Sequence, residues 1–362
     1  VHYGCEALPV DYDPRGSGYT CRVERFPIGV VFGIVPYNWP YNLAAHKLAP
    51  ALAVGNTVVL KPSSTACLST LTLARIIQEA GCPAGVVNAV PCPSSIVEKA
   101  LNDPRIAMLS FTGSPPVGWK LKGLLPEKRV SLELGGDASA IVAPDADLDW
   151  ATTRIVQGAY GYAGQICIAI QHVLVHESIY TDMRERLVRA TTECSWGDPE
   201  LEETVCGPVI NSDAADKVEA WRDEAVAAGA VVIAGGERRG NTVQPTLLEG
   251  VPCSVKLANE EVFGPLLTLA PYRDLDEALA RVNSSDYGIQ AGIFTRDLSV
   301  AERAFRELEV GGVIVNDYPT LRFDSMPYGG VKRSGFGREG VRYAMDEMTE
   351  LKTLVVRTAP EP

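Results

Sequence analysis

The chain has 362 residues, of which 46% are hydrophobic and 22% charged, so it is long and apolar enough for two packed domains. Its formal net charge of -12 argues against nucleic-acid binding, because phosphates call for a basic face. No apolar run approaches the roughly 20 residues of a membrane-spanning helix, and no leader resembles a signal peptide. We therefore expect a protein of the cytoplasm.

The nine cysteines are an odd number, include no CxxC pair and accompany only four histidines. Such a pattern suits neither a disulfide framework nor a zinc site. We predict reduced thiols and no bound metal.

The segment 28–134 alternates between apolar runs typical of β-strands and stretches with helical period. Strands are predicted at 30–35, 56–61, 85–90, 106–111 and 130–134, with helices between them at 42–55, 69–81, 94–102 and 116–125. Apolar strands joined by helices indicate a parallel sheet covered on both faces, and such sheets bind ligands at the carboxyl ends of their strands. This segment is predicted to be a nucleotide-type domain.

A second α/β unit follows. Helices are predicted at 146–161, 178–193 and 214–230, and strands at 172–176, 231–235, 266–272, 291–295 and 311–316.

The two ends of the chain read differently from these units. Segments 5–13 and 18–26 flank the turn DPRGSG and predict a hairpin, while 349–357 alternates like an edge strand. Edge strands expose unpaired backbone groups, so we expect another subunit to cover these strands.

Two stretches follow predicted strands at positions suited to a nucleotide. In FTGSPPVG, Gly113 and Ser114 precede a helix that begins with prolines, where free N–H groups favour a phosphate. In VVLKPSS, Lys61 ends a strand. The first stretch could instead be a common glycine turn, and the lysine of the second could be an ordinary solvated side chain. Neither stretch therefore identifies a site alone.

Cys167 lies in GYAGQICIAI, between a glycine-containing turn and an apolar run. A free cysteine taken alone is more often an inert buried side chain than a nucleophile. Further motifs occur in order along the chain, each at the end of a predicted strand or in a loop: IVPYNWP, SLELGG, GQICIA, EEVFGP and PYGGVKRSGFGREG.

With these motifs the chain resembles the aldehyde dehydrogenase superfamily from about residue 6 to 357, and it looks closest to the lactaldehyde and non-phosphorylating glyceraldehyde phosphate group. The resemblance implies an NAD(P)-dependent enzyme that forms a homodimer or homotetramer. Members usually carry a further N-terminal segment, so we expect a chain that starts at Val1 to be a fragment. The implied α/β architecture comprises oligomerisation strands at 6–27 and 349–358, a Rossmann-like parallel-sheet NAD(P)-binding domain at 28–135, a catalytic domain at 136–335 and a connecting segment at 336–348.

The resemblance also assigns a mechanism. It makes Cys167 the nucleophile that attacks the aldehyde carbon, with the Asn38 side-chain amide and the Cys167 backbone N–H as donors to the resulting oxyanion. Glu133 matches the general base that activates water against the thioester, and a carboxylate in an apolar pocket has a raised pKa suited to this task. Because relatives that transfer the acyl group to coenzyme A have little need for this base, Glu133 favours hydrolysis.

For the cofactor, Lys61 matches the residue that holds the adenosine ribose, Gly113 and Ser114 match the pyrophosphate turn, and Glu261 and Phe263 match the nicotinamide-ribose anchor and its packing partner. Ser64 stands where members that prefer NAD commonly have a glutamate, which would repel a 2'-phosphate. NADP should therefore be tolerated beside NAD. The remaining cofactor positions implied by the motifs are Pro36, Tyr37, Gly118 and Leu134.

The substrate is less defined. Members that use phosphorylated aldehydes tend to have an arginine immediately before the catalytic cysteine, where this chain has Ile166. We expect a small or medium neutral aldehyde, with Arg322 as an alternative partner for an anionic end or a solvated loop residue. The positions that match the aldehyde funnel of the family are Trp39, Leu43, His46, Ile166, Ile168 and Arg322.

Two other functions remain open from the sequence. A catalytically silent structural or binding homologue would keep the fold and turn over nothing. A cofactor-independent thioesterase or esterase would use Cys167 without nicotinamide, and would leave Lys61, Ser114 and Glu261 without a purpose.

Overall fold

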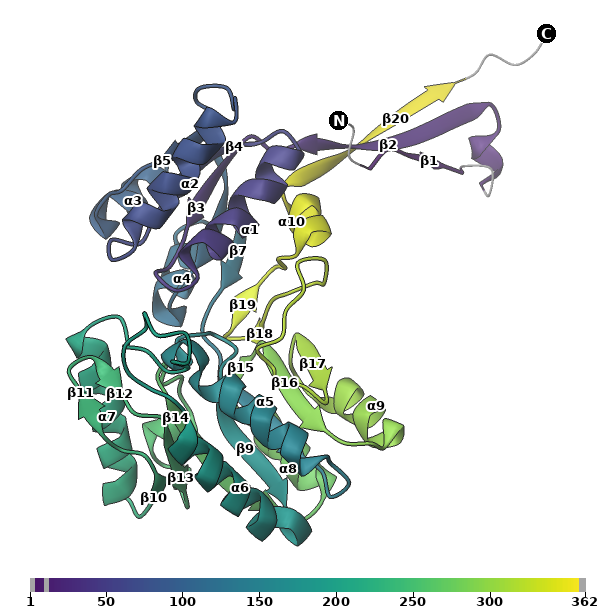
Figure 1. The fold of residues 1–362 in the computed structure, drawn as a ribbon. Helices are drawn as coiled ribbons and strands as arrows, with labels where there is room; N and C mark the ends of the chain where they lie inside the picture. Colours follow the sequence, from purple (N-terminus) through teal and green to yellow (C-terminus); the bar gives the residue numbers. More distant parts are fainter. Residues whose placement is uncertain (1–3, 10–12, 358–362) are drawn as a thin grey trace. The chain divides into compact units, whose positions relative to one another are not determined.

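The computed structural model describes residues 4–9 and 13–357, which form two compact units (Figure 1). The first unit comprises the described residues of 1–132, 323–327 and 337–362, and the second comprises 133–322 and 328–336. The chain therefore first passes from one unit to the other at Glu133.

The first unit is built on a sheet in which β7, β6, β3, β4 and β5 are neighbours in this order. Strand β3 pairs in parallel with β4 and with β6, and β4 pairs in parallel with β5. Every strand coincides with a predicted one: β3 (Val30–Ile34), β4 (Thr57–Lys61), β5 (Val87–Ala89), β6 (Ile106–Thr112) and β7 (Arg129–Glu133).

Helices connect these strands, as the sequence predicts, and bury their apolar side chains against the sheet. Val31, Leu48, Leu60 and Met108 are each 2% exposed or less in this core, which the C-terminal Met348 also joins. The helices of the unit are α1 (Pro40–Ala53), α2 (Cys67–Glu79), α3 (Ser94–Leu101), α4 (Pro115–Gly123) and α10 (Val341–Glu347).

A separate antiparallel sheet joins the two ends of the chain in the order β1-β2-β20. It consists of β1 (Glu6–Leu8), β2 (Tyr19–Pro27) and β20 (Thr349–Arg357), with the 3-10 turn η1 (Pro14–Gly16) between the first two. Thr349 is buried and the rest of β20 is exposed. Residues 10–12 of the predicted hairpin and residue 358 of the predicted last strand lie outside the described residues.

The second unit contains a seven-stranded sheet in the order β10-β13-β14-β9-β8-β16-β17. Its pairs are parallel, except that β10 runs antiparallel to β13. The strands are β8 (Ala138–Val142), β9 (Ile170–His176), β10 (Val231–Ala234), β13 (Thr246–Glu249), β14 (Leu266–Tyr272), β16 (Gln290–Phe294) and β17 (Gly312–Val315).

Strands β8 and β13 are absent from the sequence-based assignment. Both are short, and β8 follows the end of β7 after only the four residues 134–137, so the glycine motif between them reads as one loop.

Helices pack on this sheet in the second unit (Figure 1). They are α5 (Leu148–Tyr160), α6 (Tyr180–Glu193), α7 (Ser212–Ala227), α8 (Leu275–Asn283) and α9 (Leu298–Glu307). Short elements complete the unit: η2 (Gly161–Gly164), η3 (Glu177–Ile179), η4 (Lys256–Ala258), β11 (Arg238–Arg239), β12 (Thr242–Val243), β15 (Tyr287–Gly288), β18 (Val331–Lys332) and β19 (Gly335–Phe336).

No helix in the described part of the chain has the length and apolar character needed to cross a membrane.

Candidate active site

Cys167 follows a strained turn at the end of α5. Tyr162, Ala163 and Gly164 have φ angles of 57°, 55° and 68°, a left-handed conformation that costs energy in residues with a side chain and persists where packing enforces it. A Cβ on Gly164 would lie 2.3 Å from the carbonyl oxygen of Gly264. Only glycine therefore allows GQICIA and EEVFGP to approach this closely.

Gln165 holds this turn in place through hydrogen bonds of its side chain. Its side chain is buried, and its Oε1 accepts a hydrogen bond from the Ile210 backbone N–H at 2.9 Å while its Nε2 donates to the Tyr162 carbonyl at 3.3 Å. Because buried polar groups that are fully bonded hold one geometry, the backbone that precedes Cys167 is fixed.

The Cys167 thiol lies 3.0 Å from the Tyr328 hydroxyl and packs with Ile166 against Ile168 and Ile289. Burial, together with repulsion from Glu261 and Glu133, raises the pKa of the thiol to about 12, and the Tyr328 hydrogen bond counteracts this rise in part. The resting thiol is therefore neutral, and its ionisation depends on the groups around it.

The LELGG segment packs against the backbone of Cys167. Glu133 ends β7 with 3% of its surface exposed, and the Leu134 N–H donates to the Ser334 carbonyl at 2.9 Å. A Cβ on Gly136 would lie 2.0 Å from the Cys167 carbonyl oxygen. This contact requires glycine at position 136 and fixes the position of the Cys167 backbone.

Glu261 is bound to the same segment. The Gly136 N–H donates to its Oε1 at 2.9 Å, and Lys217 Nζ donates to its backbone carbonyl at 3.1 Å. Burial raises the pKa of the Glu261 carboxyl to about 7, against the lowering effect of the Gly136 bond. Phe263, also in EEVFGP, has a φ of 51°, so this motif too contains a strained position.

Arg322 lies over the Tyr328 ring, with its guanidinium carbon 3.9 Å from the ring centroid. Its charge lowers the pKa of the Cys167 thiol. Arg322 is thus partly buried beside the cysteine rather than a solvated loop residue.

The first unit holds Asn38 and most of the predicted cofactor residues. Asn38 is 5% exposed and precedes α1, while Lys61 ends β4 and donates to the Pro62 carbonyl at 3.1 Å. Ser64 is exposed. Ser114 is the N-cap of α4, which begins with prolines as predicted, and a Cβ on Gly113 would lie 2.7 Å from the Phe111 ring.

The other predicted residues of this unit lie in or just before α1 and α4, and Trp39 has a left-handed φ of 48°. Pro36 and Tyr37 are half-buried before α1, and Gly118 is buried within α4. Trp39 caps the start of α1, Leu43 follows in its first turn, and His46 Nε2 lies 3.5 Å from Asp324 Oδ1.

The structure therefore brings together, within the second unit, Cys167, Glu133, Leu134, Ile166, Ile168, Glu261 and Arg322. Sequence reasoning missed Tyr328, Gly136, Gln165 and Lys217 as parts of this cluster. Tyr328 and Gly136 lie in quoted motifs, and the paired glycines of those motifs are the signal that marks a close backbone approach. Lys217 lies on an ordinary-looking helix and carries no such signal.

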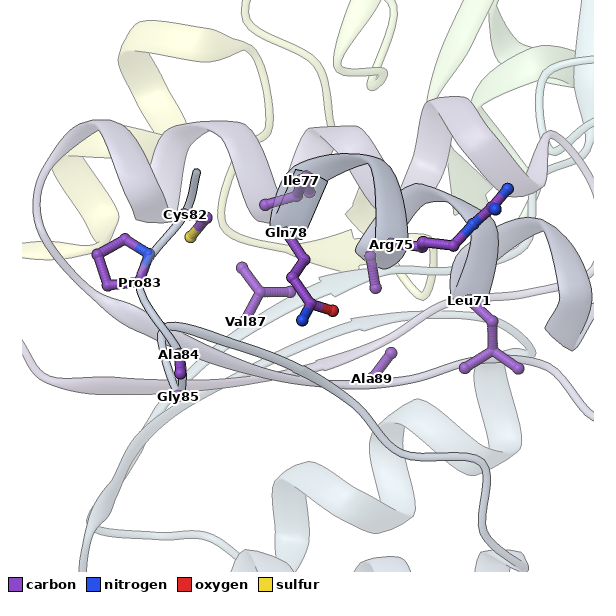
Figure 2. A pocket seen from close by; sticks show the side chains of 11 residues that line it. Leu71, Arg75, Ile77, Gln78, Cys82, Pro83, Ala84, Gly85, Val87 and Ala89 are labelled. Carbon is purple, nitrogen blue, oxygen red and sulfur yellow. The ribbon is translucent and has the colours of Figure 1, made fainter. Parts of the chain in front are cut away.

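A pocket of about 440 Å3 lies elsewhere, between α2, the following loop and β5 of the first unit (Figure 2). Its lining includes Leu71, Arg75 and Gln78 from the helix and Val87 from the strand. None of the predicted site residues lines it. Among residues 4–9 and 13–357 we find no group of three histidine, cysteine or acidic side chains that suits a metal ion.

Known proteins are similar to this chain over most of its length. The model of the aldehyde dehydrogenase family matches residues 3–354. A 3-sulfolactaldehyde dehydrogenase of Priestia aryabhattai is 44% identical over 352 residues, which cover 97% of this chain and 74% of that protein.

Two solved structures are also similar. Aldehyde dehydrogenase 21 from Physcomitrella patens, in complex with the reaction product succinate, has a TM-score of 0.96 and 44% identity, with 98% of this chain and 74% of that chain covered. NADP-dependent glyceraldehyde-3-phosphate dehydrogenase from Bacillus halodurans C-125, complexed with NADP, has a TM-score of 0.95 and 38% identity, with 98% and 75% covered. The predicted resemblance and α/β fold are confirmed.

Proposed function

The chain belongs to the aldehyde dehydrogenase family, and from this premise we propose that it oxidises a small aldehyde to the carboxylic acid through a thiohemiacetal and a thioester on Cys167. It is an NAD(P)-dependent enzyme, as are relatives such as the one from Bacillus halodurans. The observation that carries the mechanism is the close packing of the Cys167 turn on the segment that begins with Glu133.

In the proposed reaction the Cys167 thiolate forms a bond to the aldehyde carbon, and the carbonyl oxygen takes up the negative charge. The Cys167 backbone N–H and the Asn38 amide donate to this oxygen, as the family motifs imply. The hydride that leaves this carbon would pass to NAD or NADP when the cofactor is bound. Glu133 then takes a proton from water, the resulting hydroxide attacks the thioester, and the acid leaves as the carbon–sulfur bond breaks.

Several residues fit a dinucleotide. Ser114 is the N-cap of α4, where the helix dipole favours a pyrophosphate even though the prolines at the first two helical positions carry no N–H, and Gly113 precedes it where a Cβ has no room. Glu261 is fixed through Gly136 and would accept hydrogen bonds from a ribose. Lys61 would hold the second ribose, with Ser64 as a neighbour that leaves space for a 2'-phosphate.

For the substrate, the place of Arg322 beside Cys167 favours an aldehyde with an anionic end over the neutral aldehyde expected from the sequence. A guanidinium recognises carboxylate, sulfonate or phosphate through charge-assisted hydrogen bonds. The relatives whose names contain sulfolactaldehyde and glyceraldehyde-3-phosphate act on such anions. Trp39, Leu43, His46, Ile166 and Ile168 remain the proposed funnel residues.

We also propose that copies of the chain associate through the β1-β2-β20 sheet. Leu354, Val355 and Val356 of β20 are between 46% and 55% exposed, so apolar side chains are exposed on both faces of this strand and a partner would cover them. All nine cysteines are free, which suits a reducing compartment such as the cytoplasm.

The test is the absorbance of reduced nicotinamide with purified protein, a panel of neutral and anionic small aldehydes, and NAD and NADP in parallel. We expect turnover that is abolished in Cys167→Ala, and in Glu133→Gln a single burst of reduced cofactor followed by a stall at the thioester. A burst with an unchanged steady state would remove Glu133 as the base. Ester hydrolysis without nicotinamide would favour the thioesterase, and a folded protein that does neither would be the silent homologue.

A further inference from the structure

The hydroxyl of Tyr328 lies beside the sulfur of Cys167, the proposed nucleophile. Its Oη lies 3.0 Å from Cys167 Sγ, although the two residues are 161 positions apart in the chain. The tyrosine is 4% exposed and forms an apolar cluster with Ile168 and Ile289. The phenol is therefore a buried polar group whose hydrogen bond goes to the thiol.

The surroundings of the thiol oppose its ionisation. Burial is the main cause, and the carboxylates of Glu261 and Glu133 add repulsion, so the pKa of the thiol rises to about 12. Two groups act in the opposite direction, namely the Tyr328 hydrogen bond and the charge of Arg322. Because the thiolate is the form that attacks carbonyl carbon, these two groups decide how much nucleophile exists.

The direction of the hydrogen bond follows from charge. A thiolate carries no proton and can only accept, and burial raises the pKa of the Tyr328 phenol well above its ordinary value, so the phenol keeps its proton. The guanidinium of Arg322, 3.9 Å from the ring centroid, withdraws electron density and makes the hydroxyl a better donor. Neutral phenol and anionic sulfur are therefore the compatible pair.

The loop after Tyr328 holds the phenol in place. A Cβ on Gly330 would lie 2.3 Å from Ser334 Cβ, and a Cβ on Gly311 would lie 1.9 Å from the Gly329 carbonyl oxygen. Both contacts are tighter than any residue other than glycine allows, so the PYGG backbone is packed without free space. A hydrogen bond made by fixed groups away from water is stronger than the same bond in water.

We propose that Tyr328 is a further catalytic residue, whose hydroxyl donates a hydrogen bond to the Cys167 thiolate and stabilises it before the aldehyde is attacked. The proposal rests on the proposed role of Cys167 as nucleophile. Ionisation breaks the S–H bond, the electron pair stays on sulfur and the proton passes to solvent, while the Tyr328 O–H bond stays intact. Tyr328 thus acts as a donor and transfers no proton.

The experiment measures alkylation of Cys167 by iodoacetamide in the full chain, without aldehyde or cofactor, from about pH 6 to about pH 10, where the rate follows the fraction of thiolate. The modified peptide is quantified by mass spectrometry, because the chain has eight other cysteines, and Cys167→Ala gives the background. In Tyr328→Phe we expect alkylation near neutral pH to slow about tenfold and the pH profile to move up by about one unit.

The matched control is Tyr272→Phe, which removes another buried phenol of the same unit, one that donates to the Val142 carbonyl at 3.2 Å. It should leave the alkylation profile of Cys167 unchanged. A Tyr328→Phe profile that overlays the wild type overturns the proposal, as does an equal shift in both variants, since that indicates general loosening.

If Tyr328→Phe does not fold, the wild-type chain labelled with fluorotyrosine replaces it. A more acidic phenol donates more strongly, so the alkylation profile must move to lower pH, and an unchanged profile overturns the proposal. The measurement needs no turnover. A wild-type protein that fails to oxidise aldehydes would refute the proposed function. The effect of Tyr328 on the Cys167 thiol would still be decided by the alkylation profiles.

Discussion

Among single residues, Glu261 has a carboxyl group whose charge changes in the physiological range. Burial raises its pKa to about 7, and the Gly136 N–H bond and the charge of Lys217 lower it only in part. The carboxylate is ionised above this pH and becomes protonated below it. A ribose hydroxyl donates more strongly to the ionised form, so the protonation state of Glu261 should control the affinity for the dinucleotide.

We expect the dissociation constant of NAD or NADP to rise by up to about tenfold between pH 8 and pH 6, because the ionised fraction falls by about that factor around a pKa near 7. Titration of intrinsic fluorescence with each cofactor measures it. Glu261→Gln should bind weakly at both pH values and show a flat profile. A variant that keeps the wild-type slope would assign the pH dependence to another group.

The contacts at this site also show which functional residues can be identified from the sequence. Cys167, Glu133 and Glu261 stand in ordered motifs, so the chain itself announces them. Tyr328 also stands in a motif, but its contact with the thiol is not predictable from the sequence, because it exists only after two distant segments meet. The sequence alone favours a solvated loop residue for Arg322, and only the structure shows the Tyr328 ring beneath it.

At the scale of elements, alternating apolar runs predict the strands of the first unit because each run is continuous and separated by a helix. The same rule misses β8, Ala138–Val142, since only four residues separate it from β7 and they include two glycines. Those four residues include the one that makes the contacts important for function. They bring the Gly136 backbone against the Cys167 carbonyl and the Glu261 carboxylate.

Gly136 therefore yields a prediction about how one segment positions another. Gly136→Ala would place a methyl carbon 2.0 Å from the Cys167 carbonyl oxygen, so the cysteine backbone must move. Overpacking of this kind costs about 1–3 kcal/mol, and we expect both a lower free energy of unfolding in urea and a loss of turnover larger than that destabilisation alone explains.

The control for this variant is Gly161→Ala, in the turn that leads to the same cysteine. Its added Cβ meets no described atom within 4 Å, and its φ is -55°. It should change unfolding and turnover little. Equal losses in the two variants would contradict a specific role for the Gly136 contact.

At the scale of the whole molecule, β20 exposes its apolar side chains and has no partner strand on its outer side among the described residues. An edge of this kind pairs with another chain or aggregates. We expect the protein to form a defined homo-oligomer, and the double substitution Leu354→Asp with Val356→Asp to shift it to monomer, because buried carboxylates without partners are costly. Light scattering after size-exclusion chromatography measures the mass. Leu298→Asp, at an 84% exposed leucine of α9, is the control that should leave the oligomer intact. A wild-type protein that elutes as a monodisperse monomer would refute association through this sheet.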